Sequence, residues 1–252
     1  MKPNFLGIGA AKSGTTTLAN ILSSHPQISM SKRKELHYFD KEEFSDDEHS
    51  LNNYYKNFQT NKIIGEFTPS YLFMPKAPKR IKDCLGENIR LLAILRNPTF
   101  RAYSHYCHAV KNWRGEKYAK MGYPVEDLSF YEAIQSEPER LTSGLYHIRH
   151  QSYFSKGLYA NQLKRYFEIF SKQSIKVVIL EEYIANPINI LNDIYDFLAI
   201  DHIPESNFTN IRLNSQSDGK LTDSDKRYLD MLYKDSIIEL ETLLGRELSI
   251  WK

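Results

Sequence analysis

One short segment near the start of the chain gathers the groups that bind an oxyanion. GAAKSGTTTL, residues 9–18, follows an apolar stretch and precedes a helical pattern. A glycine there lets backbone amides approach an anion, the helix N-terminus adds a partial positive charge, and Lys12 adds a full one. The other candidate ligands are a glycine and four hydroxyl residues, Ser13, Gly14, Thr15, Thr16 and Thr17. The segment predicts a site for phosphate or a similar oxyanion, and a plain connection capped by a threonine is the alternative.

The order of these residues separates the segment from the phosphate loop of nucleoside triphosphatases. In that loop, G-x-x-x-x-G-K-[ST], the lysine follows the glycine and the hydroxyl residue binds magnesium. Here Lys12 precedes Gly14. The other predicted strands also lack a following aspartate that would help to hold magnesium. A nucleoside triphosphatase is therefore disfavoured, and a P-loop kinase is kept as the alternative that predicts magnesium-dependent binding of ATP.

A second candidate anion site follows another apolar stretch. In LLAILRNPTFRAYSHYCHAV, residues 91–110, Arg96 stands where the predicted strand ends, and Ser104 falls on the first turns of a predicted helix. Ligands of parallel sheets bind at the carboxyl ends of the strands. An arginine fork beside a hydroxyl suits a phosphate monoester. The alternative is an arginine that only caps carbonyl groups at the strand end.

Together the two segments resemble the donor-binding motifs of the sulfotransferases that use 3′-phosphoadenosine 5′-phosphosulfate (PAPS). KSGTT is similar to their 5′-phosphosulfate loop, and RNPTFRAYSHY, residues 96–106, is similar to their 3′-phosphate motif. The resemblance implies that Arg96 and Ser104 bind the 3′-phosphate, that Arg101 braces the loop, and that Lys12 stabilises charge on the leaving 5′-phosphate. It also implies that no metal is required and that adenosine 3′,5′-bisphosphate is a product.

The acceptor side is predicted at KRKELHYFD, residues 32–40. If residues 34–39 are extended, Glu35, His37 and Phe39 alternate onto one face. A hydroxyl acceptor needs a base near the sulfur that it attacks, and either Glu35 or His37 could serve. The motif resembles that of the glycosaminoglycan-type sulfotransferases, which implies Glu35 as the catalytic base with His37 and Asp40 in support. A solvated charged turn is the alternative.

Other stretches match this family less closely. In GEFTPSYL, residues 65–72, Phe67 replaces the lysine that the glycosaminoglycan-type enzymes usually show, which favours a less anionic acceptor than heparan sulfate. Glu66, Thr68 and Tyr71 are possible pocket residues, and Glu66 is equally a candidate ion-pair partner. Two further pairs are candidates to cover a ligand: Lys156 and Tyr159, for which a core helix with a solvated lysine is the alternative, and Arg212 or Lys220.

The elements that would carry these residues alternate along the chain. Four apolar runs read as buried strands, at Phe5–Gly9, Lys62–Phe67, Arg90–Leu95 and Lys176–Leu180. Helical patterns begin after Gly14, at Arg101 (to about Trp113), at Tyr159 (to Phe170), after Asn186-Pro187, and at Asp223 (to Leu244). This alternation predicts an α/β fold with a central, mainly parallel sheet flanked by helices. We expect one domain over residues 1–252 with the P-loop-like sulfotransferase fold that the resemblance implies. Residues 112–150, where the match is loose, are expected to shape the acceptor site.

Composition adds limits on location and partners. The net charge is +2 and 41% of the 252 residues are hydrophobic, which is typical of a soluble globular protein and gives no argument for nucleic acid. No signal peptide or apolar run long enough to cross a membrane is recognisable, and Cys84 and Cys107 are expected to be reduced thiols. We therefore expect a cytoplasmic enzyme acting on a glycan, lipid or other small-molecule acceptor. A non-catalytic nucleotide-binding module is the remaining alternative, and no pattern predicts the oligomeric state.

Overall fold

The computed structural model describes residues 1–58, 62–112, 125–203 and 220–252. Its contacts divide the chain into two compact units. The first comprises residues 1–96 and 161–214, and the second comprises residues 97–160 and 215–252. The single domain expected over residues 1–252 stays a prediction.

The first unit is built on a parallel five-stranded sheet with the strand order β2-β3-β1-β4-β5. The strands are β1 (Phe5–Gly9), β2 (Ile28–Met30), β3 (Ile63–Phe67), β4 (Arg90–Leu95) and β5 (Ile175–Ile179). Four of them confirm the predicted apolar runs to within a residue, and β2 was not predicted. The predicted α/β class with a central parallel sheet is therefore confirmed.

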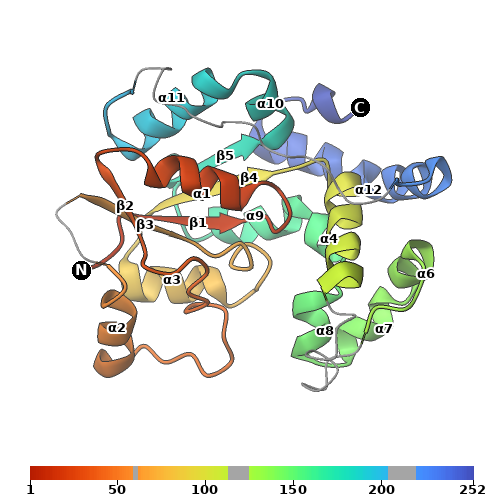
Figure 1. Cartoon of the computed structure of the whole chain (residues 1–252), viewed down its shortest axis with the longest axis horizontal. Helices are drawn as coiled ribbons and strands as arrows, with labels where there is room; N and C mark the ends of the chain where they lie inside the picture. Colours follow the sequence, from red (N-terminus) through yellow and green to blue (C-terminus); the bar gives the residue numbers. More distant parts are fainter. Residues whose placement is uncertain (59–61, 113–124, 204–219) are drawn as a thin grey trace. The chain divides into compact units, whose positions relative to one another are not determined.

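Helices cover this sheet on both faces (Figure 1). They are α1 (Thr15–Ser23), α2 (Glu48–Tyr55), α3 (Ala77–Leu85), α10 (Leu180–Ala185) and α11 (Pro187–Leu198), with α9 (Tyr159–Phe167) entering from the second unit. One continuous apolar core joins α1, α10 and α11 to the sheet through residues such as Leu18, Leu92 and Ile194. Figure 1 shows α2 and α3 on the opposite side. The strands read as near-continuous apolar runs because both faces are buried.

The second unit is helical among its described residues. Its elements are α4 (Pro98–Asn112), α6 (Phe130–Gln135), α7 (Glu137–Thr142), α8 (Leu145–His150), α12 (Asp223–Leu244) and the 3₁₀ turns Ser155–Gly157 and Ser249–Trp251. Leu229 and Tyr233 of α12 join a core with Ala102 and Ala109 of α4. The predicted bounds of α12 are confirmed, and Gly245 ends it in the left-handed conformation.

Helix α4 begins about one turn earlier than the sequence predicted. The Oδ1 atom of Asn97 accepts the backbone N–H of Thr99 at 3.1 Å, and Pro98 takes the first helical position. Proline suits that position because its missing N–H would have no partner there. Asn97-Pro98 is thus a helix start, and the start predicted at Arg101 is wrong. Trp113, its predicted end, lies outside the described residues.

The segment that follows β3 is hydrogen-bonded to the end of β1. After β3, the N–H of Thr68 donates to the carbonyl of Gly7 at 2.9 Å, and that of Leu72 donates to the carbonyl of Ile8 at 2.8 Å. A Cβ atom on Gly9 would lie 2.6 Å from the Cβ of Leu72, so a side chain at position 9 would push the two segments apart. The candidate site residues in segments 9–17, 34–40 and 66–71 therefore follow or end three neighbouring strands of one sheet, β1, β2 and β3.

Candidate functional site

The loop between β1 and α1 leaves the start of the helix open to a ligand. Lys12 has a φ of 69° and Gly14 a φ of 84°, both left-handed. Gly14 is the N-cap of α1 and supplies no side-chain hydrogen bond to it, so the predicted alternative of a threonine cap is wrong. The first N–H groups of a helix have no partner within it. These backbone donors are available to an anion, in the position where the macrodipole favours negative charge.

The hydroxyl of Ser13 is a second candidate donor in this loop. The side chain is 0% exposed, and its Oγ has no hydrogen-bond partner among the described residues. A buried hydroxyl without a partner costs free energy, and such groups in native proteins usually await a ligand or water. Thr15 is also buried, Thr17 is half-buried and Thr16 is exposed. The loop therefore fits an oxyanion such as the 5′-phosphosulfate of PAPS.

Arg96 comes to the same loop from the neighbouring strand. It follows β4, which pairs with β1, and its Nη1 donates to the carbonyl of Lys12 at 3.5 Å. The Arg96 guanidinium is therefore brought to the backbone of the loop that carries Lys12, at the carboxyl ends of adjacent strands. This arrangement concentrates positive charge beside the open helix start.

Ser104 and Arg101 lie on α4, in the second unit. The Ser104 side chain is half-buried. Arg101 is buried, and its guanidinium donates to the carbonyl of Tyr153. Arg101 thus braces the segment before the 3₁₀ turn at residues 155–157. The pairing of Ser104 with Arg96 around a phosphate stays a prediction.

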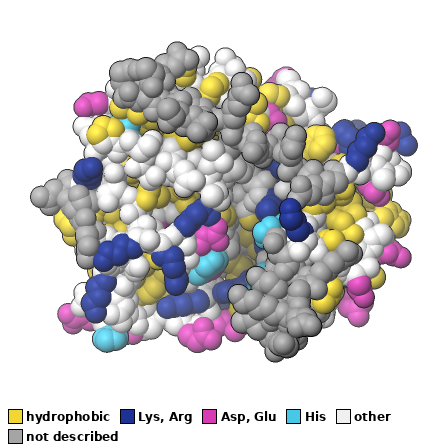
Figure 2. Space-filling view, in the orientation of Figure 1, with side chains coloured by type: hydrophobic (Ala, Val, Ile, Leu, Met, Phe, Trp, Pro, Cys, Tyr) yellow, Lys and Arg dark blue, Asp and Glu magenta, His cyan; other side chains and the backbone are white. Residues whose placement is uncertain are grey.

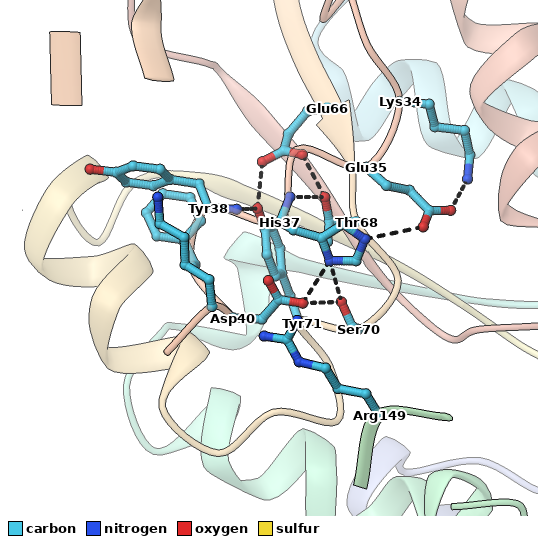
Figure 3. Close-up of polar contacts among 12 residues, drawn as sticks. Lys34, Glu35, His37, Tyr38, Asp40, Glu66, Thr68, Ser70, Tyr71 and Arg149 are labelled. Atoms are coloured by element: carbon cyan, nitrogen blue, oxygen red, sulfur yellow. Dashed lines mark hydrogen bonds and ion pairs between the residues drawn. The ribbon is translucent and has the colours of Figure 1, made fainter. Parts of the chain in front are cut away.

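Glu35 and His37 form a compact charged cluster with their neighbours (Figure 3). The Nε2 atom of His37 lies 3.5 Å from Glu35 Oε2, and its Nδ1 lies 2.9 Å from Asp40 Oδ2. Lys34 Nζ binds the other oxygen of Glu35, and the Ser70 hydroxyl donates to Asp40. The supporting position predicted for Asp40 agrees with these contacts. Ser70 was missed, although its hydroxyl follows β3 in the same TPS turn as Thr68.

The charges in this cluster distinguish its two candidate bases. Each ring nitrogen of His37 faces a carboxylate, so both must carry hydrogen. Hydrogen bonds to Asp40 and Glu35 raise the pKa of His37 to about 9. The hydrogen bond from His37, followed by the contacts of Lys34, lowers the pKa of Glu35 to about 2, against the effect of burial. At neutral pH His37 is a cation with no free site for a proton, whereas Glu35 is an ionised acceptor.

The cluster is accessible from solvent. The side chains of Glu35 and His37 are 39% and 43% exposed. Figure 2 shows acidic and histidine side chains next to each other near the centre of the face in view, with lysine and arginine side chains around them. A substrate can therefore reach both groups without opening the core.

The backbone that carries this cluster differs from the sequence prediction. Residues 34–39 form no strand, and Glu35 and His37 have φ values of 60° and 52°. The extended conformation predicted from alternation is therefore wrong. The two side chains meet instead because left-handed residues turn the chain back on itself. Hydrogen bonds from the N–H groups of residues 35, 37 and 38 to β3 and the turn after it hold that shape.

The residues suggested for a pocket around β3 are core residues. Glu66, Thr68 and Tyr71 are fully buried, and Glu66 accepts hydrogen bonds from both Thr68 and Tyr71. Phe67 is also fully buried, and its ring lies edge-on to that of Phe5 at 6.4 Å. Position 67 therefore adds no cation to the site.

The remaining candidates are placed less directly. Lys156 is buried and donates to the carbonyl of Arg149, so it is not the solvated lysine of the alternative. Tyr159 is buried against Trp251, as expected for a core helix. Lys220 is exposed, and Arg212 and residues 113–124 of the expected acceptor region lie outside the described residues. Cys84 and Cys107 are free thiols.

Within residues 1–58, 62–112, 125–203 and 220–252, no cluster of His, Cys, Asp and Glu side chains is arranged to hold a metal ion. No helix in the described part of the chain has the length and apolar character that crossing a bilayer requires. The cytoplasmic location and the independence from metal stay predictions.

The chain is similar in sequence to known sulfotransferases. The membrane-associated sulfotransferase kil1 of Dictyostelium discoideum is 25% identical over 97% of this chain, which spans 66% of that protein. The human bifunctional heparan sulfate N-deacetylase/N-sulfotransferase 3 is 26% identical over 99% of this chain, which spans 31% of that protein. The chain is thus shorter than these relatives.

Solved structures of sulfotransferases also resemble this chain. A sulfotransferase from Alicyclobacillus acidocaldarius has a TM-score of 0.80 and 29% identity, with 100% of this chain and 99% of that one covered. A mouse sulfotransferase complexed with PAP shares the fold, with a TM-score of 0.55, 17% identity, and 93% and 84% of the two chains covered. The sulfotransferase domain family matches residues 2–231. The resemblance found in the sequence is confirmed, and the chain belongs to the sulfotransferase family.

Proposed function

We propose that this chain transfers a sulfuryl group from PAPS to a hydroxyl group of an acceptor, giving adenosine 3′,5′-bisphosphate. The observation that carries the proposal is the loop of residues 9–17. It joins a buried Ser13 hydroxyl that has no described partner to an uncapped helix start, with Lys12 in the loop and Arg96 bonded to it. A ligand with an anionic group would accept hydrogen bonds from these donors and balance the positive charge of Lys12 and Arg96.

Different residues of the chain would bind the two phosphate groups of PAPS. The N–H groups at the start of α1 and the hydroxyls of Ser13, Thr15, Thr16 and Thr17 would hold the 5′-phosphosulfate, and Arg96 with Ser104 would hold the 3′-phosphate. Bound PAPS supplies the activated sulfuryl group. Lys12 would neutralise the charge that develops on the leaving phosphate, in the way that preorganised charges stabilise transition states. PAP, which is adenosine 3′,5′-bisphosphate, is bound by the mouse relative of the same fold, which supports this donor.

Glu35 is proposed as the base that takes the proton of the acceptor hydroxyl. It is ionised and exposed, whereas His37 is protonated on both nitrogens at neutral pH. A carboxylate held by Lys34 and His37 is a weak base in the resting protein. We propose that the acceptor hydroxyl replaces one of these contacts, which raises the pKa of Glu35 as the proton moves. His37, held by Asp40, would remain a cation beside the reacting groups.

The acceptor is proposed to be a carbohydrate, lipid or other small alcohol. Relatives of this chain include enzymes named for heparan sulfate, which supports a glycan. The buried Phe67 supplies no cation at its position, which favours an acceptor with less negative charge than heparan sulfate.

Transfer of labelled sulfate from PAPS tests the proposal. The chain is incubated with labelled PAPS and a panel of glycans, glycolipids and alcohols, with a chelator present, and each product is separated and counted. We expect transfer to at least one hydroxyl acceptor, and its loss in Lys12→Ala and Glu35→Gln. Full transfer by both variants would contradict the assignment. Binding of ATP with magnesium in place of PAPS would support a kinase, and donor binding without turnover would support a non-catalytic module.

A further inference from the structure

A buried carboxylate lies beneath the loop that carries Glu35 and His37 (Figure 3). Glu66, on β3, is 0% exposed. Its Oε1 accepts hydrogen bonds from the hydroxyls of Tyr54 at 3.0 Å and Tyr71 at 2.9 Å. Its Oε2 accepts one from the hydroxyl of Thr68 at 2.8 Å. The proposed mechanism assigns no role to this group.

Two of these hydroxyls connect Glu66 to the backbone of the loop. The hydroxyl of Tyr71 accepts the N–H of Tyr38 at 3.0 Å, and that of Thr68 accepts the N–H of His37 at 3.4 Å. Glu66 also accepts the N–H of Leu36 itself. The backbone donors of residues 36–38 therefore all end on Glu66, either directly or through one hydroxyl.

The direction of these hydrogen bonds is determined by counting hydrogens. A hydroxyl carries a single hydrogen, and a backbone N–H can only donate. Because the oxygens of Tyr71 and Thr68 receive N–H groups, their own hydrogens point at Glu66. One hydroxyl hydrogen therefore points at each oxygen of Glu66, and a carboxylate accepts both. Burial raises the pKa of Glu66, and the hydrogen bonds from Thr68, Tyr71 and Tyr54 oppose this by favouring the carboxylate. An amide of the same shape would turn its NH₂ group against one of them.

The loop itself needs such support. Glu35 and His37 both lie in the left-handed region, which residues with a side chain seldom adopt. Backbone of this kind persists where the surroundings over-determine it. The hydrogen bonds that end on Glu66 hold this backbone in place. A further hydrogen bond runs from the N–H of Glu35 to the carbonyl of Phe67 at 3.1 Å.

We propose that Glu66 is a positioning residue for the transfer reaction. As a carboxylate it orients the hydroxyls of Thr68 and Tyr71, which hold the backbone of residues 36–38 and so set Glu35 and His37 in place. The inference rests on the proposed function for the role of Glu35, whereas the hydrogen-bond arrangement is independent of it.

Glu66→Gln tests the proposal with little change of shape. Displacement of Glu35 by about an ångström is expected to lower kcat about 10²-fold, because proton removal depends on alignment. The affinity for adenosine 3′,5′-bisphosphate is expected to stay that of the wild type. A second readout is the titration of the His37 ring by NMR. Glu35, Asp40 and Ser70 face this ring, and their displacement would return its pKa from about 9 toward the usual value. Wild-type kcat with an unchanged His37 titration would overturn the proposal.

Two tyrosines provide a matched control. Tyr54→Phe and Tyr71→Phe each remove one buried hydroxyl that donates to the same oxygen of Glu66. Only Tyr71 also bonds to the loop, at Tyr38. We expect kcat to fall about tenfold in Tyr71→Phe and to stay within about twofold in Tyr54→Phe. Thr68→Ser should keep the activity that Thr68→Val loses. Equal losses in the two tyrosine variants would show a purely structural role.

The outcomes separate this inference from the proposed function. If the wild type transfers nothing from PAPS, the proposed function fails, and the His37 titration still decides the role of Glu66. If Glu66→Gln does not fold, the two tyrosine variants carry the test with the same readouts. In either case an unchanged titration of His37 in Glu66→Gln or Tyr71→Phe contradicts the proposal. A lowered pKa of His37 in these variants supports it.

Discussion

Two loops at the carboxyl ends of the strands, residues 9–17 after β1 and residues 34–40 after β2, arrange their polar groups in opposite ways. In residues 9–17 the helix start is uncapped, and the buried Ser13 hydroxyl has no described partner. In residues 34–40 the polar groups bond to one another, since Glu35, His37, Asp40 and Ser70 form one connected set. The first loop is preorganised for a ligand, and the second is closed on itself.

This difference separates binding from proton transfer. The backbone donors at the start of α1 are in place before an anion binds, so the donor side costs little reorganisation. A carboxylate that is already paired with Lys34 and His37 must give up a contact before it can accept a proton. Substitutions in the first loop are therefore expected to affect affinity, and substitutions in the second to affect turnover.

The largest expected effect is that of Glu35→Gln on turnover. Removal of a general base is expected to lower kcat about 10³-fold, with the affinity for adenosine 3′,5′-bisphosphate unchanged. Steady-state transfer assays and calorimetry measure the two quantities. Glu43→Gln, an exposed carboxylate nearby in sequence, is the control and should behave as the wild type. A loss of donor affinity as large as the loss of kcat would remove the distinction between the loops.

Lys12→Ala is expected to affect both steps. Loss of the loop cation should weaken binding of adenosine 3′,5′-bisphosphate and lower kcat/KM about 10²-fold, because the same charge holds the phosphate and stabilises it as it leaves. Lys79→Ala, which removes an exposed lysine from a surface ion pair with Asp83, is the charge-matched control. Wild-type kcat/KM in Lys12→Ala would show that this lysine is only a surface charge.

A pair of serine substitutions compares the loops directly. Ser13→Ala removes a buried hydroxyl without a described partner, so stability should be unchanged or slightly higher while the affinity for adenosine 3′,5′-bisphosphate falls about tenfold. Ser70→Ala removes a hydroxyl bonded to Asp40 and should lower the unfolding free energy by about 1 kcal/mol without affecting that affinity. Denaturant unfolding and calorimetry distinguish the two patterns. The same pattern in both variants would contradict the comparison.

The smallest expected effect is on the pH dependence of stability. The folded-state pKa of His37 is raised to about 9, so its stabilisation is complete below about pH 6.5 and is lost as the pH rises through about 9. The folded-state pKa of Glu35 is lowered to about 2, so its stabilisation is present above about pH 4.5 and is lost as the pH falls through about 2. Both side chains are more than a third exposed, which limits the effect to under about 1 kcal/mol.

Urea unfolding of the wild type and His37→Gln at several pH values measures this contribution. The wild type should be more stable than the variant near pH 6, and the difference should shrink as the pH approaches 9.5. A difference that stays constant over this range would mean that the ring is not held between two carboxylates.

The parts of the fold predicted from sequence are those with strong local patterns. The strands β1, β3, β4 and β5 are runs of apolar residues bounded by polar turns, and α12 has an apolar stripe and a glycine at its end. Strand β2 was missed because its three residues are too few to show alternation. The local pattern also failed to predict the start of α4. Asn97-Pro98 is typical of the end of an element, but here Asn97 caps the helix and Pro98 is its first residue.

The residue types of the site were predicted better than their arrangement. Lys12, Arg96, Glu35 and His37 were singled out because charged and hydroxyl residues follow apolar strands. The left-handed backbone at Glu35 and His37 was not, because it depends on hydrogen bonds to Thr68 and Tyr71, more than 30 positions away in sequence. Such long-range contacts leave no periodic signal near residue 35.

Calorimetric titration of the intact chain with adenosine 3′,5′-bisphosphate tests the central claim most directly, because it asks whether the open loop holds this donor. The account predicts binding in the presence of a chelator, about tenfold weaker in Ser13→Ala and unchanged in Glu35→Gln. ATP with magnesium should not compete. Absence of binding, or preferential binding of ATP with magnesium, would contradict the account.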